Sequence, residues 1–185
     1  MEKQFIELCK TGNLDNIKKF VESQYVNIYV NEESGFRWAC KNGHINIVKY
    51  LINLNKRNTD YTKINIHTNN EYGFRWACYN GHLHIVEYLT NLYKINMDYK
   101  IINIHSYDES GFRWACNDGH LHIVKYLINL YKIRQSRNMD YKIINIHSLD
   151  NSGFRWACDN CHKYIVKYLL SIGSYLPNHE YIVLL

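Results

Sequence analysis

Gly35-Phe36-Arg37-Trp38-Ala39-Cys40 is the stretch that decides the fold, because the same six residues occur four times in the chain. The other copies begin at Gly73, Gly111 and Gly153, so successive copies start 38, 38 and 42 residues apart. Identity at a nearly constant spacing predicts a repeat protein, in which small units stack to bury a continuous core.

The first three copies continue into a Gly-His pair and the fourth into Cys161-His162. A second apolar stripe follows in each, and in the first copy it covers residues 45–54. Phe36, Ala39 and Cys40 fall at i, i+3 and i+4, the spacing of one buried helix face, so we predict a first helix over about 35–42. Gly43 can take the left-handed conformation that ends it. A second helix follows from about residue 45.

Ile64–His67, Ile102–His105 and Ile144–His147 repeat the sequence Ile-Asn-Ile-His between the units. Alternating apolar and polar residues, followed by Asn, Asp, Glu and Ser, favour a short extended arm that ends in a turn. A more polar copy opens the chain around Gly12, as expected of a terminal repeat with one face in water.

This order of turn, helix, Gly-His, helix and arm resembles the ankyrin repeat from Phe5 to about Gly173. The most specific part of the resemblance is the string Ala-Cys-x-Asn-Gly-His-x-x-Ile-Val-x-Tyr-Leu, which begins at Ala39 and is similar to the ankyrin pattern Ala-Ala-x-x-Gly-His-x-x-Val-Val-x-x-Leu-Leu. The repeats exceed the usual 33 residues, which predicts longer second helices or projecting loops. The Phe-Arg-Trp-Ala-Cys variant, in an Asn- and Ile-rich chain, is similar to ankyrin proteins of giant amoebal viruses, the Mimivirus-like type.

The resemblance implies an all-α repeat solenoid of stacked ankyrin helix-turn-helix units with short hairpin-like arms. We expect a single array over residues 1–185. Its parts are an N-terminal capping repeat at 1–25, repeats at 26–63, 64–101, 102–143 and 144–173, and a C-terminal tail or incomplete cap at 174–185.

Charge and hydropathy narrow the class of protein. The formal net charge is +5, with 22 basic and 17 acidic residues interleaved rather than clustered, so we do not expect a nucleic-acid partner. The sequence contains neither a run of about 18 apolar residues nor the apolar stretch of a signal peptide. We therefore expect no membrane contact and a cytoplasmic location, which is the host cytoplasm if the protein is viral, with reduced cysteines.

Cys158-Asp159-Asn160-Cys161-His162 matches the Cys-x-x-Cys-His pattern of haem attachment, but the repeat explains most of it. Cys158 is the helix cysteine of every unit, and His162 is the histidine of Gly-His. We therefore expect no haem. Only Cys161 is new, and because it replaces glycine it predicts local backbone strain.

The remaining repeated residues are interpreted as structural. Histidines two positions apart, at 82/84 and 120/122, point to different helix faces, so we expect no metal. The Gly-His histidines should hydrogen-bond a neighbouring backbone. The helix cysteines and the tryptophans (Trp38, Trp76, Trp114 and Trp156) are assigned to the core. Without a nucleophile, a base and a closed pocket together, the chain is expected to be neither an enzyme nor a cofactor binder.

Four arginines recur at one position: Arg37, Arg75, Arg113 and Arg155. The first three follow a glutamate by four residues (Glu33, Glu71 and Glu109), and we expect these acids to neutralise them. Arg155 has Asn151 in that place, so it is expected to be freer to meet an anionic partner.

Recognition is expected at positions that differ between the copies, because the constant positions pack. After the helix cysteine the series is Lys41, Tyr79, Asn117 and Asp159, and at the arm tips it is Asn31, Asn69, Tyr107 and Leu149. The resemblance implies that these positions line a concave groove. We predict that they and Arg155 bind a partner, with Tyr79, Tyr107 and Leu149 as anchors.

The predicted function is therefore a non-enzymatic protein-protein interaction module, an adaptor for a host protein if the chain is viral, and we expect a monomer. Two alternatives stay open. One is a nucleic-acid-associated scaffold that uses the ladder of arginines, and the other is a structural fragment of a longer array.

Overall fold

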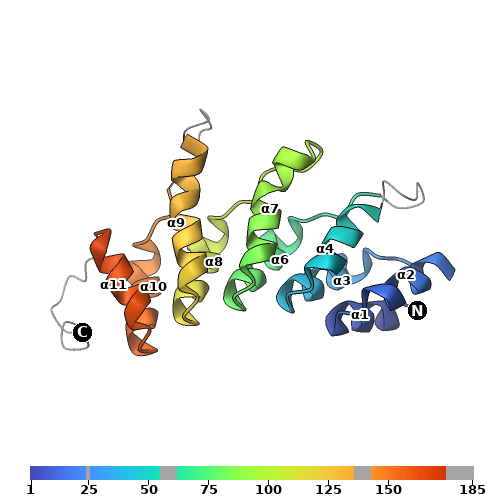
Figure 1. The fold of residues 1–185 in the computed structure, drawn as a ribbon, viewed down its shortest axis with the longest axis horizontal. Coiled ribbons are helices and arrows are strands. Elements are labelled where there is room, and N and C mark those ends of the chain that lie inside the picture. Colours follow the sequence, from blue (N-terminus) through green and yellow to red (C-terminus); the bar gives the residue numbers. More distant parts are fainter. Residues whose placement is uncertain (24–25, 55–61, 136–142, 174–185) are drawn as a thin grey trace. The chain divides into compact units, whose positions relative to one another are not determined.

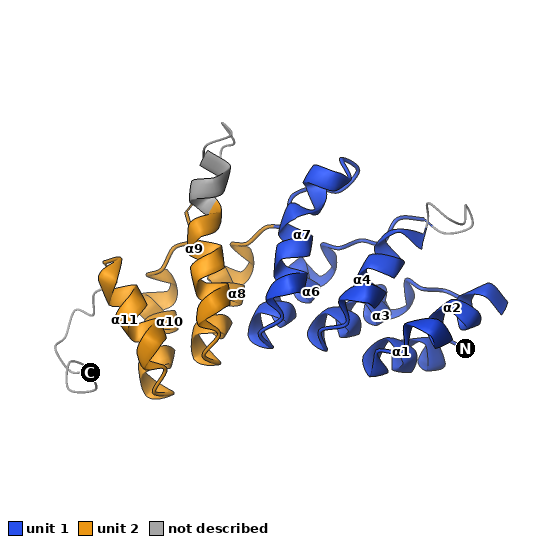
Figure 2. Cartoon of the chain, in the orientation of Figure 1, with its two compact units in different colours: residues 1–102 blue, residues 103–185 orange. Residues whose placement is uncertain are grey.

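The computed structural model describes residues 1–23, 26–54, 62–135 and 143–173, which contain ten helices and no strand (Figure 1). The chain divides into two compact units, residues 1–102 and 103–185, and each is described by itself (Figure 2). The predicted tail or incomplete cap, 174–185, lies outside the described residues. No helix of the described residues is long and apolar enough to cross a bilayer.

The helices come in pairs, one pair to a repeat. Unit 1 holds α1 (Glu2–Thr11) with α2 (Leu14–Ser23), α3 (Val30–Lys41) with α4 (Ile45–Ile52), and α6 (Thr68–Tyr79) with α7 (Leu83–Ile95). Unit 2 holds α8 (Ser106–Asn117) with α9 (Leu121–Gln135), and α10 (Ser148–Asp159) with α11 (Lys163–Ser171).

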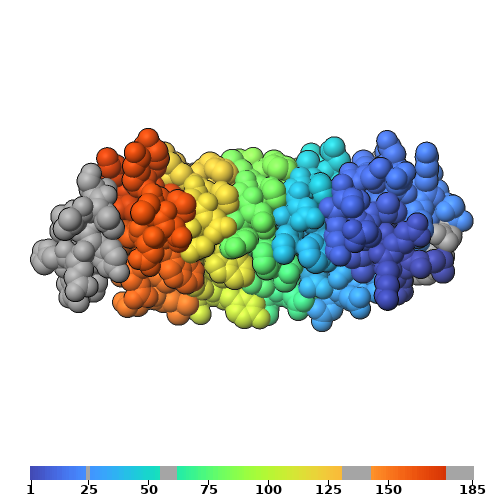
Figure 3. Space-filling model, turned by 90° about the horizontal axis from the view of Figure 1, so that it is seen from below, coloured from blue at the N-terminus to red at the C-terminus, as the bar shows by residue number. Residues whose placement is uncertain are grey.

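Within each unit the first helices of the pairs pack side by side. In unit 1, α3 lies between α1 and α6, and in unit 2, α8 packs against α10. Space-filling atoms show the repeats of each unit as successive bands (Figure 3). The first helices bury Phe, Ala and Cys, and the second helices bury Ile, Val and Leu. The predicted all-α repeat fold is thereby confirmed.

Within each unit, the glycine that opens a Phe-Arg-Trp-Ala-Cys copy lets neighbouring first helices approach closely. A Cβ on Gly73 would lie 3.0 Å from Phe36 Cε1 and 3.1 Å from Cys40 Sγ, both of the preceding repeat. A Cβ on Gly35 would lie 2.6 Å from Phe5 Cε1. Gly35, Gly73 and Gly153 are therefore the surfaces on which the phenylalanine of the repeat before each of them packs.

The Gly-His pair makes a second contact between repeats. Gly43 has a φ of 81°, and the imidazole of His82 lies against it, so that a Cβ there would be 2.7 Å from His82 Cε1. His82 Nε2 lies 3.0 Å from the carbonyl oxygen of Lys41. His44 and His162 contact the carbonyls of Lys10 and Asn117 in the same way. The expected bond to a neighbouring backbone is confirmed at these three histidines.

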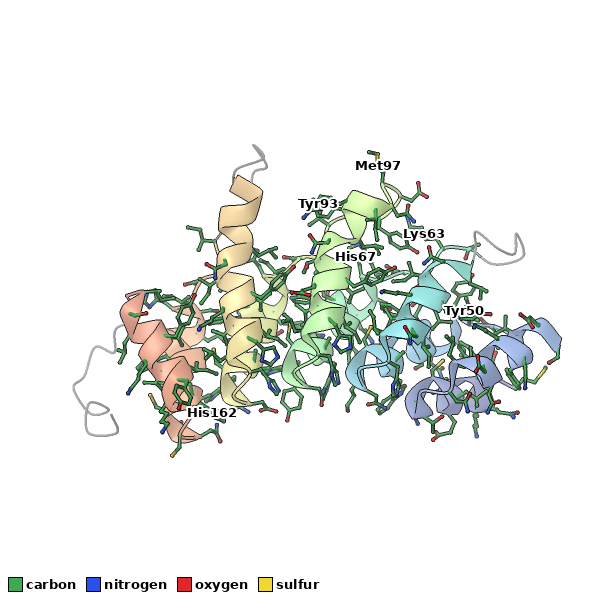
Figure 4. The ribbon with its side chains drawn as sticks, in the orientation of Figure 1. Tyr50, Lys63, His67, Tyr93, Met97 and His162 are labelled. Carbon is green, nitrogen blue, oxygen red and sulfur yellow. The ribbon has the colours of Figure 1, made fainter. Side chains whose placement is uncertain are left out.

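The extra length of the repeats lies where the sequence indicated. Helix α7 has 13 residues and α9 has 15, whereas α4 has 8. After α7 the chain turns at Asn96 and returns through Tyr99, which is buried and donates its hydroxyl to the carbonyl of Ile52. Met97, at the tip of this turn, points away from the fold and is 95% exposed (Figure 4). The corresponding residues after α9, 136–142, lie outside the described residues.

The first prediction concerns the Gly-His contact. Gly43→Ala should lower the free energy of unfolding by roughly 2–3 kcal/mol, because the methyl group adds left-handed strain and a clash with His82.

Cys161 already has a φ of 58° where the other repeats have glycine, so the expected strain is present. Cys161→Gly should therefore raise the stability by about 0.5–1 kcal/mol. Urea denaturation followed by circular dichroism measures both, and equal effects of the two variants would contradict this reading.

The second prediction concerns the cysteines. All six are free, and Cys161 is the exposed one. Burial raises the pKa of Cys9 to about 12 and that of Cys158 to about 11, and it raises the pKa of Cys40, Cys78 and Cys116 further. Thiolates form only as the pH approaches the pKa, so at pH 8 the folded chain should react with a thiol reagent at one cysteine. In denaturant all six thiols should react. Fast labelling of the folded Cys161→Ser variant would contradict the assignment of Cys161 as the reactive cysteine.

Candidate protein-binding face

Each predicted arm leads through a turn into three consecutive left-handed residues, which the sequence pattern did not predict. In the second repeat Asn65 Oδ1 accepts a hydrogen bond from the His67 amide at 3.1 Å, and the next turn closes between Glu71 N and His67 O. Asn69, Asn70 and Glu71 have φ values of 50°, 51° and 64°. The same three consecutive left-handed residues occur at 31–33, 107–109 and 149–151.

Side chains hold these turns, since each left-handed L-residue costs roughly 1–2 kcal/mol. The Arg75 guanidinium donates from Nε to Asn70 O at 2.8 Å and from Nη2 to Asn69 O at 3.0 Å. His67 Nδ1 donates to Glu71 Oε1 at 2.9 Å. Both carbonyls of the turn are thus satisfied from within the repeat.

Arg113 repeats this arrangement in unit 2, where it donates to the carbonyls of Asp108 and Tyr107 at 2.7 and 3.0 Å. Glu109 lies 3.0 Å from His105 Nδ1. The spacing of four residues predicted that the glutamates neutralise the arginines. Arg75 and Arg113 donate hydrogen bonds to backbone carbonyls, because the left-handed turn brings these carbonyls under the guanidinium. Glu71 and Glu109 lie against histidines, and the charge of Glu109 also acts on Arg113.

Burial limits what these arginines can bind. Arg75 and Arg113 are each 8% exposed, and burial lowers the pKa of Arg113 while Asp108 and Glu109 oppose that shift. Arg155 differs, because its side chain is 41% exposed and lies 3.3 Å from Asp150 Oδ2. Arg155 is thus more exposed than Arg75 and Arg113 but has an acidic partner of its own, and its role in binding stays a prediction.

The turn tips differ between the units. Asn31 and Asn69 occupy them in unit 1, and asparagine tolerates the left-handed region well. Tyr107 and Leu149 occupy them in unit 2 with φ values of 50° and 46°, and they are 57% and 53% exposed. A bulky side chain here strains the backbone and places apolar surface in water.

The tryptophans are not in the core, contrary to the prediction. Trp38 and its three equivalents are half-buried. Each helical residue advances by about 100°, so Trp38 lies on the side opposite the buried Phe36, Ala39 and Cys40. The helical spacing within Gly35–Cys40 therefore already indicated that the tryptophan does not share the buried face. The regularity of the tryptophans reflects a shared surface rather than a shared interior.

In unit 1 these tryptophans join a cluster of cations and aromatic rings. Lys41 Nζ lies 3.9 Å from the centre of the Trp76 ring and 4.8 Å from that of Trp38. Lys10 Nζ lies 4.7 Å from Trp38, and Tyr79 meets Trp76 edge-on at 5.1 Å. We name these five residues the first-helix face of unit 1. Lys41 and Tyr79 were predicted from the variable position after the helix cysteine. Lys10 was not, although it also follows a helix cysteine, Cys9.

The equivalent positions in unit 2 carry different chemistry. Asn117 Oδ1 accepts a hydrogen bond from Asn160 at 3.2 Å, and Asp159 is exposed. The Arg113 guanidinium lies 5.4 Å from the centre of the Trp156 ring. These residues (Asn117, Trp156 and Asp159) form the first-helix face of unit 2, which is neutral to acidic where that of unit 1 is cationic.

Metal-ligand clusters, histidine pairs and surface hollows are other kinds of candidate site, but the histidine pair at 82/84 and the hollows beside Lys63 and Tyr50 include no variable position of the first helices. Among the described residues no group of three or more His, Cys, Asp and Glu side chains could hold a metal. His82 and His84 each direct Nε2 at a carbonyl, of Lys41 and Gly43 respectively. A hollow of about 460 Å³ lies beside Lys63 and His67, and one of about 300 Å³ beside Tyr50 (Figure 4). Neither includes a residue of the first-helix face.

Comparison with known proteins agrees with the fold. The model of the family of ankyrin repeats, in three copies, matches residues 5–101 and 74–179. Acyl-CoA-binding domain-containing protein 6 of Rattus norvegicus and that of Homo sapiens are each 33% identical over 54 residues, which is 28% of this chain. The match covers 19% of these relatives, so the chain spans about a fifth of their length.

The third prediction compares the stability loss at an arginine that holds a turn, Arg75, with the loss at the more exposed Arg155. Arg75→Gln should destabilise unit 1 by about 2–3 kcal/mol, because two charge-assisted hydrogen bonds to strained carbonyls are lost. Arg155→Gln should change the stability by less than about 0.5 kcal/mol, since its exposed ion pair contributes little. Thermal melting of both variants checks this, and equal losses would mean that the arginines do not hold the turns.

Proposed function

Since this chain belongs to the ankyrin-repeat family, whose members are generally protein-protein interaction modules, we propose that it is a non-enzymatic adaptor that binds a partner protein. The partner would contact the first-helix faces and the turn tips, the positions that line the concave face of an ankyrin array. These are Lys41, Tyr79, Asn117 and Asp159 on the helices, Asn31, Asn69, Tyr107 and Leu149 at the tips, and Arg155.

One observation carries the proposal: Tyr107 and Leu149 are exposed apolar residues held at positive φ. The folded chain alone would be more stable with asparagine there, as at the two tips of unit 1. Side chains retained at a cost to stability are typical of binding sites. Tyrosine in addition ranks among the residues that contribute most to protein interfaces.

We also propose that the chain is a viral protein and that its partner comes from the host. The Phe-Arg-Trp-Ala-Cys repeat and the Asn- and Ile-rich composition support a protein of a giant amoebal virus. The partner would then be a host protein in the host cytoplasm. This part rests on the resemblance and not on the geometry of the binding surface.

The nucleic-acid alternative loses its main support. It needs a ladder of four available arginines, but Arg75 and Arg113 are buried and donate to backbone carbonyls. A guanidinium in that position cannot reach a phosphate without releasing its turn. Protein binding is therefore the function that the described surface supports best.

The fourth prediction tests the proposal by capture from amoebal lysate on the immobilised chain at low and high salt. A protein partner should be retained at high salt, whereas nucleic acid should be lost steeply with salt. Tyr79→Ala/Tyr107→Ala should weaken the capture at least about thirtyfold, the loss expected when one hot-spot residue is removed.

Tyr50→Ala/Tyr164→Ala is the matched control, because it also removes one half-buried tyrosine from unit 1 and one exposed tyrosine from unit 2. It should leave the capture unchanged, since both residues lie on second helices. Equal losses in the two variants, or capture of salt-labile nucleic acid alone, would refute the proposed surface.

A further inference from the structure

Lys10 and Lys41 hold the same place in successive repeats, because each follows the buried cysteine of its first helix. The two ammonium groups lie 4.7 and 4.8 Å from the centre of the Trp38 ring, so they are less than about 10 Å apart. Trp76 contacts Lys41 from the next repeat at 3.9 Å. The indole rings thus hold two neighbouring cations in place on unit 1.

Few acidic groups balance these cations. Glu7 lies 3.3 Å from Lys10, but its side chain is 62% exposed. Among the described residues, no carboxylate forms an ion pair with Lys41. Two like charges within one Debye length repel each other, so an added carboxylate would be attracted to both. Since the indoles also restrict the lysine rotamers, less side-chain entropy is lost when an anion binds.

We propose that the first-helix face of unit 1 binds an acidic segment of the partner protein, and this inference rests on the proposed function. Lys10 and Lys41 would each meet one carboxylate. In an extended segment, side chains two residues apart lie on the same side and about 7 Å from each other, which is within the upper limit of about 10 Å between the two ammonium groups. Tyr79, at the equivalent position of the next repeat, would pack against the residue that follows the two acids.

The same lysines do not favour single-stranded nucleic acid. A site of that kind pairs cations with open aromatic faces on which bases stack. Here Lys41 lies over Trp76 and, with Lys10, over Trp38, so the protein's own ammonium groups already occupy positions on these rings. The charge stays available to a carboxylate, while the stacking surface is covered.

The test is a selection of random twelve-residue peptides, displayed on phage, on the immobilised full chain and on Lys10→Glu/Lys41→Glu. Peptides from the wild-type chain should be enriched in Asp and Glu over the starting library, and those from the variant should not. Selected peptides should bind the variant at least about tenfold more weakly, because each carboxylate then meets a like charge. Thermal melting establishes that the variant is folded.

Lys18→Glu/Lys49→Glu is the matched control. Lys18 pairs with Asp15 and Lys49 lies over the Tyr88 ring, so this variant also reverses one ion-paired and one ring-bound lysine of unit 1, but on the second helices. It should change the affinity by less than about twofold. Equal losses in the two variants, or acidic enrichment that persists on Lys10→Glu/Lys41→Glu, would overturn the inference.

The remaining outcomes separate this inference from the proposed function. Selected peptides that lack acidic residues but lose binding in Tyr79→Ala/Tyr107→Ala would refute the acidic partner and leave the binding face intact. A failure to select any peptide would count against both. Oligouridine that displaces the selected peptides and binds more tightly than they do would assign the surface to nucleic acid instead.

Discussion

Within each unit, the close contact between the first helices of neighbouring repeats is the constraint on which the rest of the unit depends. Phenylalanine packs on a helical glycine, and histidine packs on the glycine that ends the preceding first helix, with a carbonyl as its hydrogen-bond partner. Neither contact leaves room for a Cβ. The constancy of Gly, Phe and His along the sequence is therefore a steric requirement, and recognition is left to the positions that face away from these contacts.

The second requirement is a chain reversal between repeats without strands to support it. Three consecutive left-handed residues achieve this reversal, at a backbone cost that the arginine and the histidine-carboxylate pair offset. Ser148 also donates to the carbonyl of Asp108, so the two turns of unit 2 are tied together. Because these side chains hold the backbone, the residue at the tip is free to vary. Asparagine, tyrosine and leucine all occur there.

The two units carry different chemistry on equivalent surfaces. The position after the helix cysteine is occupied by Lys10, Lys41 and Tyr79 in unit 1 and by Asn117 and Asp159 in unit 2. The bulky tips Tyr107 and Leu149 belong to unit 2. Such differences on a constant scaffold are how one fold supports many binding specificities, because affinity depends on a few exposed anchors rather than on the repeat itself.

The sequence by itself determined the repeat, the pairs of helices, the buried faces and the histidine contacts, because helical periodicity and identity between copies report directly on packing. It also located the variable positions. Only the tertiary structure decided that three left-handed residues follow each arm, since no local rule favours three such residues in succession. The partners of Arg75 and Glu71 likewise depended on where that turn places its carbonyls. Lys10, Lys41 and Trp76 come from three repeats, so the pattern within any single repeat could not show that they meet.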